Sequence, residues 1–164
     1  ILEIGTGRTT FLFNCFEEIS ICSMEQDIEW KKKLIELLKK YKINSEIILS
    51  DIEKLPRGAK FTNLPSFEPD LLYIDGPFYP KPRKNTFDTL GGKPAYYDFK
   101  TLFDRNIFPK VIMIEGRIST AEEITKSSYF KKYHFEGEYA YCIKKKYFIS
   151  ALKFKRHSVF VRKD

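Results

Sequence analysis

The chain has 164 residues, of which 43% are hydrophobic and 31% are charged, and its formal net charge is +7. This composition is typical of one folded domain and excludes a disordered or fibrous protein. No apolar run reaches the length that a bilayer requires, so the sequence predicts no transmembrane helix.

Cysteine and histidine are sparse. Cys15, Cys22 and Cys142 form an odd, scattered set, which indicates buried thiols in a reducing compartment and a cytoplasmic protein. The chain has only His134 and His157, and neither lies near a cysteine in the sequence. We therefore expect no metal site.

The stretch 1–10, Ile-Leu-Glu-Ile-Gly-Thr-Gly-Arg-Thr-Thr, indicates the end of a buried strand, a glycine turn and the start of a helix. A dinucleotide fingerprint has a third glycine where Thr10 stands. Glu25, twenty positions after Gly5, can accept hydrogen bonds from both hydroxyls of a ribose. Both features favour a ribose-bearing ligand without a diphosphate.

The first half of the chain then alternates between predicted strands and helices. We expect helices over 9–18 and 28–41, strands over 19–24, 46–49 and 71–74, and a loop over 54–69. Glu3, Glu25 and Asp75 stand at or near strand ends. Because ligands bind outside the carboxyl ends of parallel strands, we expect these three side chains to surround one crevice.

The second half begins with an irregular stretch, 78–97, which we interpret as a substrate lid. A short helix over 98–106 and a strand over 111–114 follow. Thr120 and Glu123 predict a capping box for a helix that reaches about Tyr129. The segments 134–142, 147–155 and 158–162 have the composition of strands.

Three motifs together resemble the class I S-adenosylmethionine-dependent methyltransferases. They are Leu-Glu-Ile-Gly-Thr-Gly-x-Thr-Thr (2–10), Ser-Met-Glu-Gln-Asp-Ile-Glu-Trp (23–30) and Asp-Leu-Leu-Tyr-Ile-Asp-Gly-Pro (70–77). The first and second resemble the branch with a Thr-Thr loop and a tryptophan after the ribose-binding glutamate. An α/β core with a glycine turn and no cofactor is the alternative.

The resemblance implies an α/β fold, a three-layer Rossmann-like sandwich with a mostly parallel sheet and an antiparallel C-terminal hairpin. The whole chain, 1–164, would be a single methyltransferase-like domain that lacks its N-terminal part, since Ile1 falls inside a strand.

The resemblance also implies S-adenosyl-L-methionine as cofactor. The implied cofactor-binding residues are Glu3, Gly5, Thr6, Gly7, Thr9, Glu25, Gln26, Asp51, Ile52 and Asp75. Asp51 and Ile52 would lie near the adenine, although Asp51 can equally cap a local turn. Trp30 either packs in the protein or shapes the adenosine pocket.

Asp75 is the candidate catalytic residue, as a base or as an orienting acceptor. Alternatively, it only holds the amino group of the cofactor or the loop backbone. His134 is a second candidate base, although a lone histidine among aromatic residues usually packs. Candidate substrate residues are Tyr79, Arg83, Glu115 and Arg117. Arg83 can hold an anionic acceptor, whereas Glu115 and Arg117 can also pair with each other.

Oxygen or nitrogen of a small molecule is the expected methyl acceptor. A nucleic acid is the alternative, because eight Lys or Arg residues and one acidic residue occur from Lys144 to Asp164. Asp75-Gly76-Pro77-Phe78 also resembles the Asp-Pro-Pro-Phe/Tyr element of methyltransferases that act on nucleic-acid bases, with Gly76 in place of the first proline. A non-catalytic α/β binding module is a third possibility. The sequence leaves the oligomeric state open.

Overall fold

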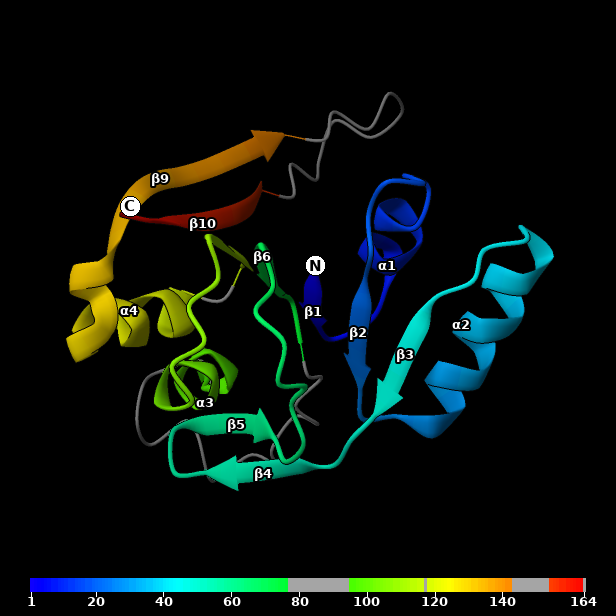
Figure 1. Cartoon of the computed structure of the whole chain (residues 1–164), viewed down its shortest axis with the longest axis horizontal. Coiled ribbons are helices and arrows are strands. Elements are labelled where there is room, and N and C mark those ends of the chain that lie inside the picture. Colours follow the sequence, from blue (N-terminus) through cyan, green and yellow to red (C-terminus); the bar gives the residue numbers. More distant parts are fainter. Residues whose placement is uncertain (77–94, 117, 143–153, 164) are drawn as a thin grey trace.

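The computed structural model describes residues 1–76, 95–116, 118–142 and 154–163. Within these residues the backbone forms a seven-stranded sheet and a smaller three-stranded sheet, accompanied by α-helices (Figure 1). None of the described helices is both long enough and apolar enough to cross a membrane.

The large sheet is mostly parallel and ends in an antiparallel pair, which confirms the expected fold class. Its strand order is β3 (Glu46–Leu49), β2 (Cys22–Glu25), β1 (Leu2–Ile4), β6 (Leu71–Ile74), β8 (Val111–Glu115), β10 (Phe154–Arg162) and β9 (Tyr133–Cys142). The first five strands run parallel, and β10 is antiparallel to both β8 and β9. The chain order reverses between β1 and β6, which creates a switch point in the middle of the sheet.

The central strands are buried because both of their faces are covered. Leu2 and Ile4 of β1 pair in register with Leu72 and Ile74 of β6, and all four side chains are fully buried. Near-continuous apolar strands of this kind are typical of parallel sheets. The core therefore holds the strand ends that carry the candidate site in fixed positions.

Helix α2 (Ile28–Lys40) begins and ends close to where the sequence predicts. The Asp27 carboxylate accepts hydrogen bonds from the backbone N–H groups of Glu29 and Trp30, at 2.9 and 3.0 Å. The buried Leu34 and Leu38 pack against Ile47 of β3. These contacts place the first turn of α2 beside the end of β2.

Helix α1 (Arg8–Phe13) is shorter than the expected 9–18. The side-chain amide of Asn14 donates to the Thr10 carbonyl at 2.6 Å and to Ser45 Oγ at 3.1 Å, next to the helix end. Such local side-chain bonds compete with helix continuation. The strand expected over 19–24 is β2, which starts at Cys22 and ends at Glu25.

The expected loop over 54–69 is wrong in its first part. Strands β4 (Ile52–Leu55) and β5 (Gly58–Phe61) form a hairpin, and β7 (Ala95–Tyr96) adds to it in parallel. A Cβ on Gly58 would lie 1.8 Å from the Ala95 carbonyl oxygen, so only glycine allows this close approach. The end of the predicted lid, 95–97, is therefore β7 and the residue that precedes α3, whereas 78–94 lie outside the described residues.

Helices α3 (Asp98–Asp104) and α4 (Ile118–Lys126) lie beside the β6 and β8 half of the sheet, and a 3-10 helix, η2 (Ser128–Lys132), follows α4 (Figure 1). The predicted capping box at Thr120 is wrong. Thr120 is buried inside α4, and its Oγ1 accepts a hydrogen bond from the Tyr96 N–H at 2.9 Å. The expected segment 158–162 is the end of β10, and 147–153 lie outside the described residues.

Candidate functional site

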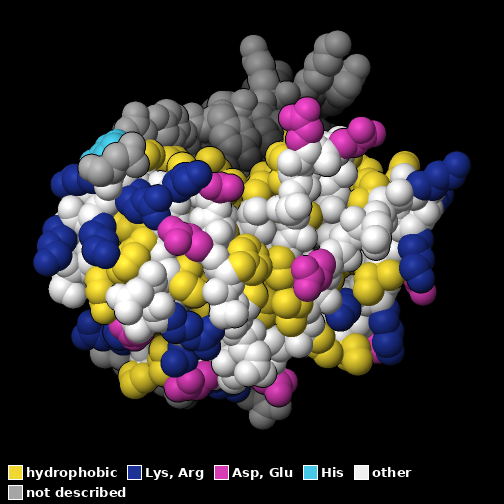
Figure 2. All heavy atoms as spheres, viewed as in Figure 1, with side chains coloured by type: hydrophobic (Ala, Val, Ile, Leu, Met, Phe, Trp, Pro, Cys, Tyr) yellow, Lys and Arg dark blue, Asp and Glu magenta, His cyan; other side chains and the backbone are white. Residues whose placement is uncertain are grey.

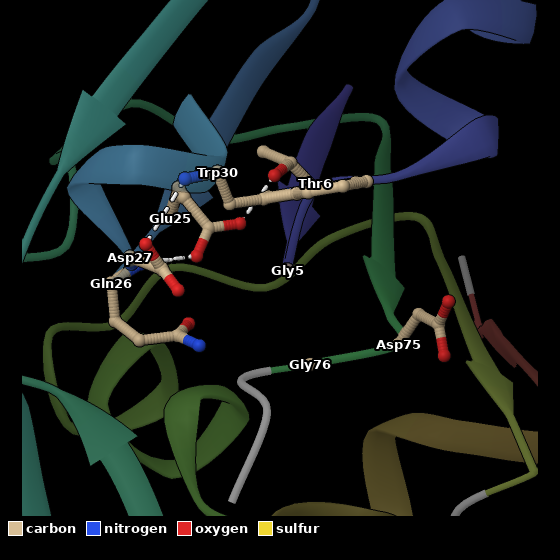
Figure 3. Close-up of a pocket in the computed structure, with 8 residues that line it drawn as sticks. All are labelled: Gly5, Thr6, Glu25, Gln26, Asp27, Trp30, Asp75 and Gly76. Atoms are coloured by element: carbon tan, nitrogen blue, oxygen red, sulfur yellow. Dashed lines mark hydrogen bonds between the residues drawn. The ribbon is translucent and has the colours of Figure 1, made fainter. Parts of the chain in front are cut away.

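A cavity of about 360 Å³ opens at the carboxyl ends of β1, β2 and β6, at the switch point of the sheet. Ligand sites of open α/β proteins lie at this position. The described residues that line it are Gly5, Thr6, Glu25, Gln26, Asp27, Trp30, Asp75 and Gly76 (Figure 3).

Two glycines bring the backbones after β1 and β6 into contact at the base of this cavity. Gly5 has φ +87°, and a Cβ on it would lie 2.5 Å from the Gly76 Cα atom. The N–H groups of Asp75 and Gly76 both donate to the Ile4 carbonyl, at 3.0 and 2.7 Å. The contact therefore requires glycine at both positions.

Two backbone N–H groups of the glycine turn donate to other groups of the protein. Gly5 N–H donates to the Met24 carbonyl at 3.1 Å, and Gly7 N–H donates to Thr10 Oγ1 at 2.9 Å. A diphosphate-binding turn directs such groups at phosphate oxygens instead. The N–H groups of Gly5 and Gly7 are therefore not directed at a phosphate.

Glu25 stands at the end of β2, where its carboxylate is held between the glycine turn and the start of α2. One oxygen accepts from the N–H groups of Gln26 and Asp27, each at 2.8 Å, and the other accepts from Thr6 Oγ1 (Figure 3). These three hydrogen bonds fix the orientation of the Glu25 carboxylate at the wall of the cavity.

Glu3 lies beneath the glycine turn, fully buried, and is not among the residues that line the cavity. Its carboxylate accepts hydrogen bonds from Thr9, Thr10 and Ser23. Burial raises the pKa of Glu3, the three hydroxyl bonds oppose that rise, and the Asp75 carboxylate adds to it. Glu3 thus connects β1 to the start of α1, through Thr9 and Thr10, and to β2, through Ser23.

The cavity is acidic. Glu25, Asp27 and Asp75 line it, and no Lys, Arg or His is among its described lining residues. A carboxylate-lined cleft attracts cationic ligands and repels a diphosphate. No group of three or more potential metal ligands occurs in the described residues.

Asp75 lies on the opposite wall from Glu25, and its side chain points away from Glu25 (Figure 3). Next to it on β6, the buried Tyr73 hydroxyl donates to a Glu115 carboxylate oxygen. Burial strongly raises the pKa of Tyr73, and the Glu115 and Asp75 carboxylates raise it further. Tyr73 therefore keeps its proton and holds the Glu115 carboxylate, which is not among the lining residues of the cavity.

The structure brings together some of the predicted site residues and separates others. Gly5, Thr6, Glu25, Gln26 and Asp75 line the cavity, and Gly7 lines a neighbouring groove. Asp51, whose carbonyl accepts from Thr62, and Ile52 of β4 are not among the lining residues. Tyr79, Arg83 and Arg117 lie outside the described residues.

Three lining residues were not among the implied cofactor-binding residues: Asp27, Trp30 and Gly76. Asp27 is the N-cap of α2. An aspartate directly before an amphipathic helix is the sequence signal that could have identified it. Trp30 is 45% exposed in the first turn of α2 and lines the cavity, as one of its two interpretations anticipates. Gly76 follows the end of β6 directly.

No protein-family model and no curated protein matches this sequence. Solved structures do match its fold. A methyltransferase from Pyrococcus furiosus has 12% identity and a TM-score of 0.57, with 98% of this chain and 73% of that chain covered. The precorrin-6Y C5,15-methyltransferase of Geobacter metallireducens has 17% identity and a TM-score of 0.50, with 99% and 78% covered.

A candidate tRNA (m1A22) methyltransferase from Streptococcus pneumoniae, solved in complex with S-adenosyl-L-methionine, has 9% identity and a TM-score of 0.54. The match covers 99% of this chain and 65% of that chain. At these identities the likeness establishes the architecture. The chain has the Rossmann-like fold of the class I S-adenosylmethionine-dependent methyltransferases.

Proposed function

We propose that this protein is an S-adenosylmethionine-dependent methyltransferase that acts on an oxygen or nitrogen of a small molecule. One observation carries the proposal. The Gly5–Gly76 contact and the Glu25 carboxylate converge on one acidic cavity at the switch point of the sheet. The fold neighbours, one of them solved with this cofactor, support the same conclusion.

The residues of the cavity fit this cofactor. Glu25 would accept hydrogen bonds from the ribose hydroxyls, and the carboxylates would favour the positive charges of the sulfonium and amino groups. Trp30 and Gln26 extend the wall on the Glu25 side, where the adenine would lie (Figure 3). The cofactor supplies an electrophilic methyl group on a positively charged sulfur.

Asp75 is the proposed catalytic residue. It lies across the cavity from Glu25, so a bound cofactor would lie between the two residues. For a hydroxyl acceptor, Asp75 would take or orient its proton while proximity supplies most of the rate. Holding the cofactor amino group is the alternative role. Glu115, with Tyr79, Arg83 and Arg117, remains a proposed contributor to acceptor binding.

Isothermal calorimetry with S-adenosylhomocysteine tests the cofactor assignment. We expect Glu25→Ala to weaken binding by about tenfold to a hundredfold, because hydrogen bonds to a charged group contribute about 1.5–3 kcal/mol. Glu25→Gln keeps the shape and one acceptor oxygen, so its loss should be smaller. Glu29→Ala is the matched control, since Glu29 is exposed at the start of α2 and pairs with Lys32. Equal affinity in all four proteins would reject the proposal.

A nucleic-acid acceptor is the second candidate. The candidate tRNA methyltransferase among the fold neighbours favours it, as do the Lys and Arg side chains spread over the surface in Figure 2. Binding to a polyanion would weaken steeply as salt increases. Filter binding of RNA and DNA fragments from low to moderate salt checks this, and absence of binding at low salt removes this candidate.

A further inference from the structure

A second cavity lies between α1 and α2 and encloses about 510 Å³. We call it the α1–α2 groove. Its lining includes the apolar Phe11, Trp30, Leu37 and Tyr41, together with the basic Arg8 and Lys33. Trp30 also lines the proposed cofactor cavity, so the two cavities are neighbours.

The apolar wall of the groove is exposed to solvent. Leu37 and Tyr41 are 46% and 56% exposed, and Tyr41 meets Phe11 edge to face with ring centroids 5.2 Å apart. Leu12 on α1 and Phe16 just after it are also exposed, although neither lines the groove. Hydrophobic side chains also reach the surface beside the lysines of α2 (Figure 2). Apolar surface gathered in one region marks a binding site more often than scattered residues do.

The charged side chains that line the groove are both positive. Arg8 and Lys33 are exposed, and no Asp or Glu is among the described lining residues. Neither cation forms an ion pair with another residue in the ranges that the structure describes. Two uncompensated cations beside an apolar wall are complementary to a ligand with a hydrophobic body and a negative end.

We propose that the α1–α2 groove binds a small amphiphile with one anionic head group and an apolar tail. The tail packs against Phe11, Leu37 and Tyr41, and the head group contacts Arg8 and Lys33. The enclosed volume lies in the range of small-molecule sites, roughly 300–1,000 Å³. This favours a small molecule over a helix of another protein. The proposal is independent of the cofactor assignment.

Trp30 is the single tryptophan of the chain, so its fluorescence reports directly on the groove. The experiment titrates the full chain with decanoate below its critical micelle concentration, and with decanol as the uncharged match. We expect a saturable change with decanoate and much weaker binding of decanol. Arg8→Ala/Lys33→Ala should weaken decanoate binding about tenfold or more, the effect of losing a charge-assisted hydrogen bond.

Lys32→Ala/Lys39→Ala is the matched control, because it removes two exposed positive charges from α2 that do not line the groove. It should retain decanoate binding, as should Glu25→Ala. Leu37→Asp alters an exposed side chain and should abolish the response while circular dichroism stays unchanged.

Three results would overturn the proposal. Decanol binding as tightly as decanoate would show apolar adsorption alone. Loss of binding in Glu25→Ala would locate the ligand in the cofactor cavity. A Trp30 signal that changes with protein concentration, with a dimer in light scattering, would assign the groove to a second copy of the chain.

Discussion

Gly5 and Gly76 lie at the ends of neighbouring strands with their backbones in contact. Gly5 has a positive φ, and a Cβ on it would come within 2.5 Å of the Gly76 Cα atom, so there is no room for a side chain. The close contact between the two backbones therefore depends on the absence of a side chain at both positions.

Gly5→Ala should therefore lower the free energy of unfolding by about 1–3 kcal/mol and weaken S-adenosylhomocysteine binding. Gly7→Ala is the matched control for the loss of stability, because its added Cβ would meet nothing within 4 Å and its φ of 177° is extended backbone. Urea denaturation and calorimetry measure the two effects. Similar losses for both variants would contradict this account.

The acidic residues also separate by role at the residue scale. The motifs placed Glu3, Glu25 and Asp75 at strand ends, and the structure has them around one end of β1, β2 and β6. Their contacts distinguish them, because Glu3 is bonded to three hydroxyls and does not line the cavity, whereas Glu25, although also buried, and Asp75 do line it. A strand pattern predicts at which end of the strand a residue lies, but not whether its carboxylate faces the cavity.

At the scale of elements, Thr120 joins α4 to the short strand β7. It lies in the first turn of α4, and its Oγ1 accepts a hydrogen bond from the buried N–H of Tyr96 at 2.9 Å. The sequence of Thr120 and Glu123 is the same whether Thr120 caps a helix or accepts a hydrogen bond from Tyr96. Only the position of β7, far away in the sequence, distinguishes the two.

Thr120→Val keeps the side-chain shape but leaves the buried Tyr96 N–H without its acceptor. We expect a loss of about 1–3 kcal/mol in the free energy of unfolding. Thr125→Val, on the exposed side of the same helix, should change it by less than about 0.5 kcal/mol. Chemical denaturation of both variants provides the measurement, and a Thr120→Val protein as stable as wild type would disprove the role.

At the scale of the whole molecule, one buried carboxylate couples stability to pH. Asp98 is fully buried at the start of α3, where Oδ1 accepts from the Phe61 N–H at 2.8 Å and Oδ2 has no hydrogen-bond partner among the described residues. Burial raises the pKa of Asp98 from 3.8 to about 7, against the opposing effect of the backbone hydrogen bonds and Lys60.

Because the folded protein binds this proton more tightly than the unfolded chain, its contribution is fully present below about pH 4 and is lost as pH rises through 7. The change is on the order of 4 kcal/mol. The raised pKa of Glu3 acts in the same direction. Denaturation of wild type and Asp98→Asn from pH 4 to 8 should show a steeper decline in wild type. Parallel profiles would refute this coupling.

The sequence by itself determined the mostly parallel sheet, the start of α2 and the convergence of the glycine turn with Glu25. These features follow from patterns in the sequence: apolar runs typical of strands buried on both faces, an amphipathic pattern from Ile28, and a glycine turn directly after a strand. Such patterns act over a few residues and are therefore visible in the chain.

Only the tertiary structure decided that the hairpin β4–β5 joins Ala95 and Tyr96 in a second sheet, and that Thr120 and Asp98 are buried. The partners that fix these features are far away in the chain, as for Gly58 with Ala95 or Phe61 with Asp98. Long-range packing sets their surroundings, and a local pattern carries no information about a partner that folding brings from elsewhere.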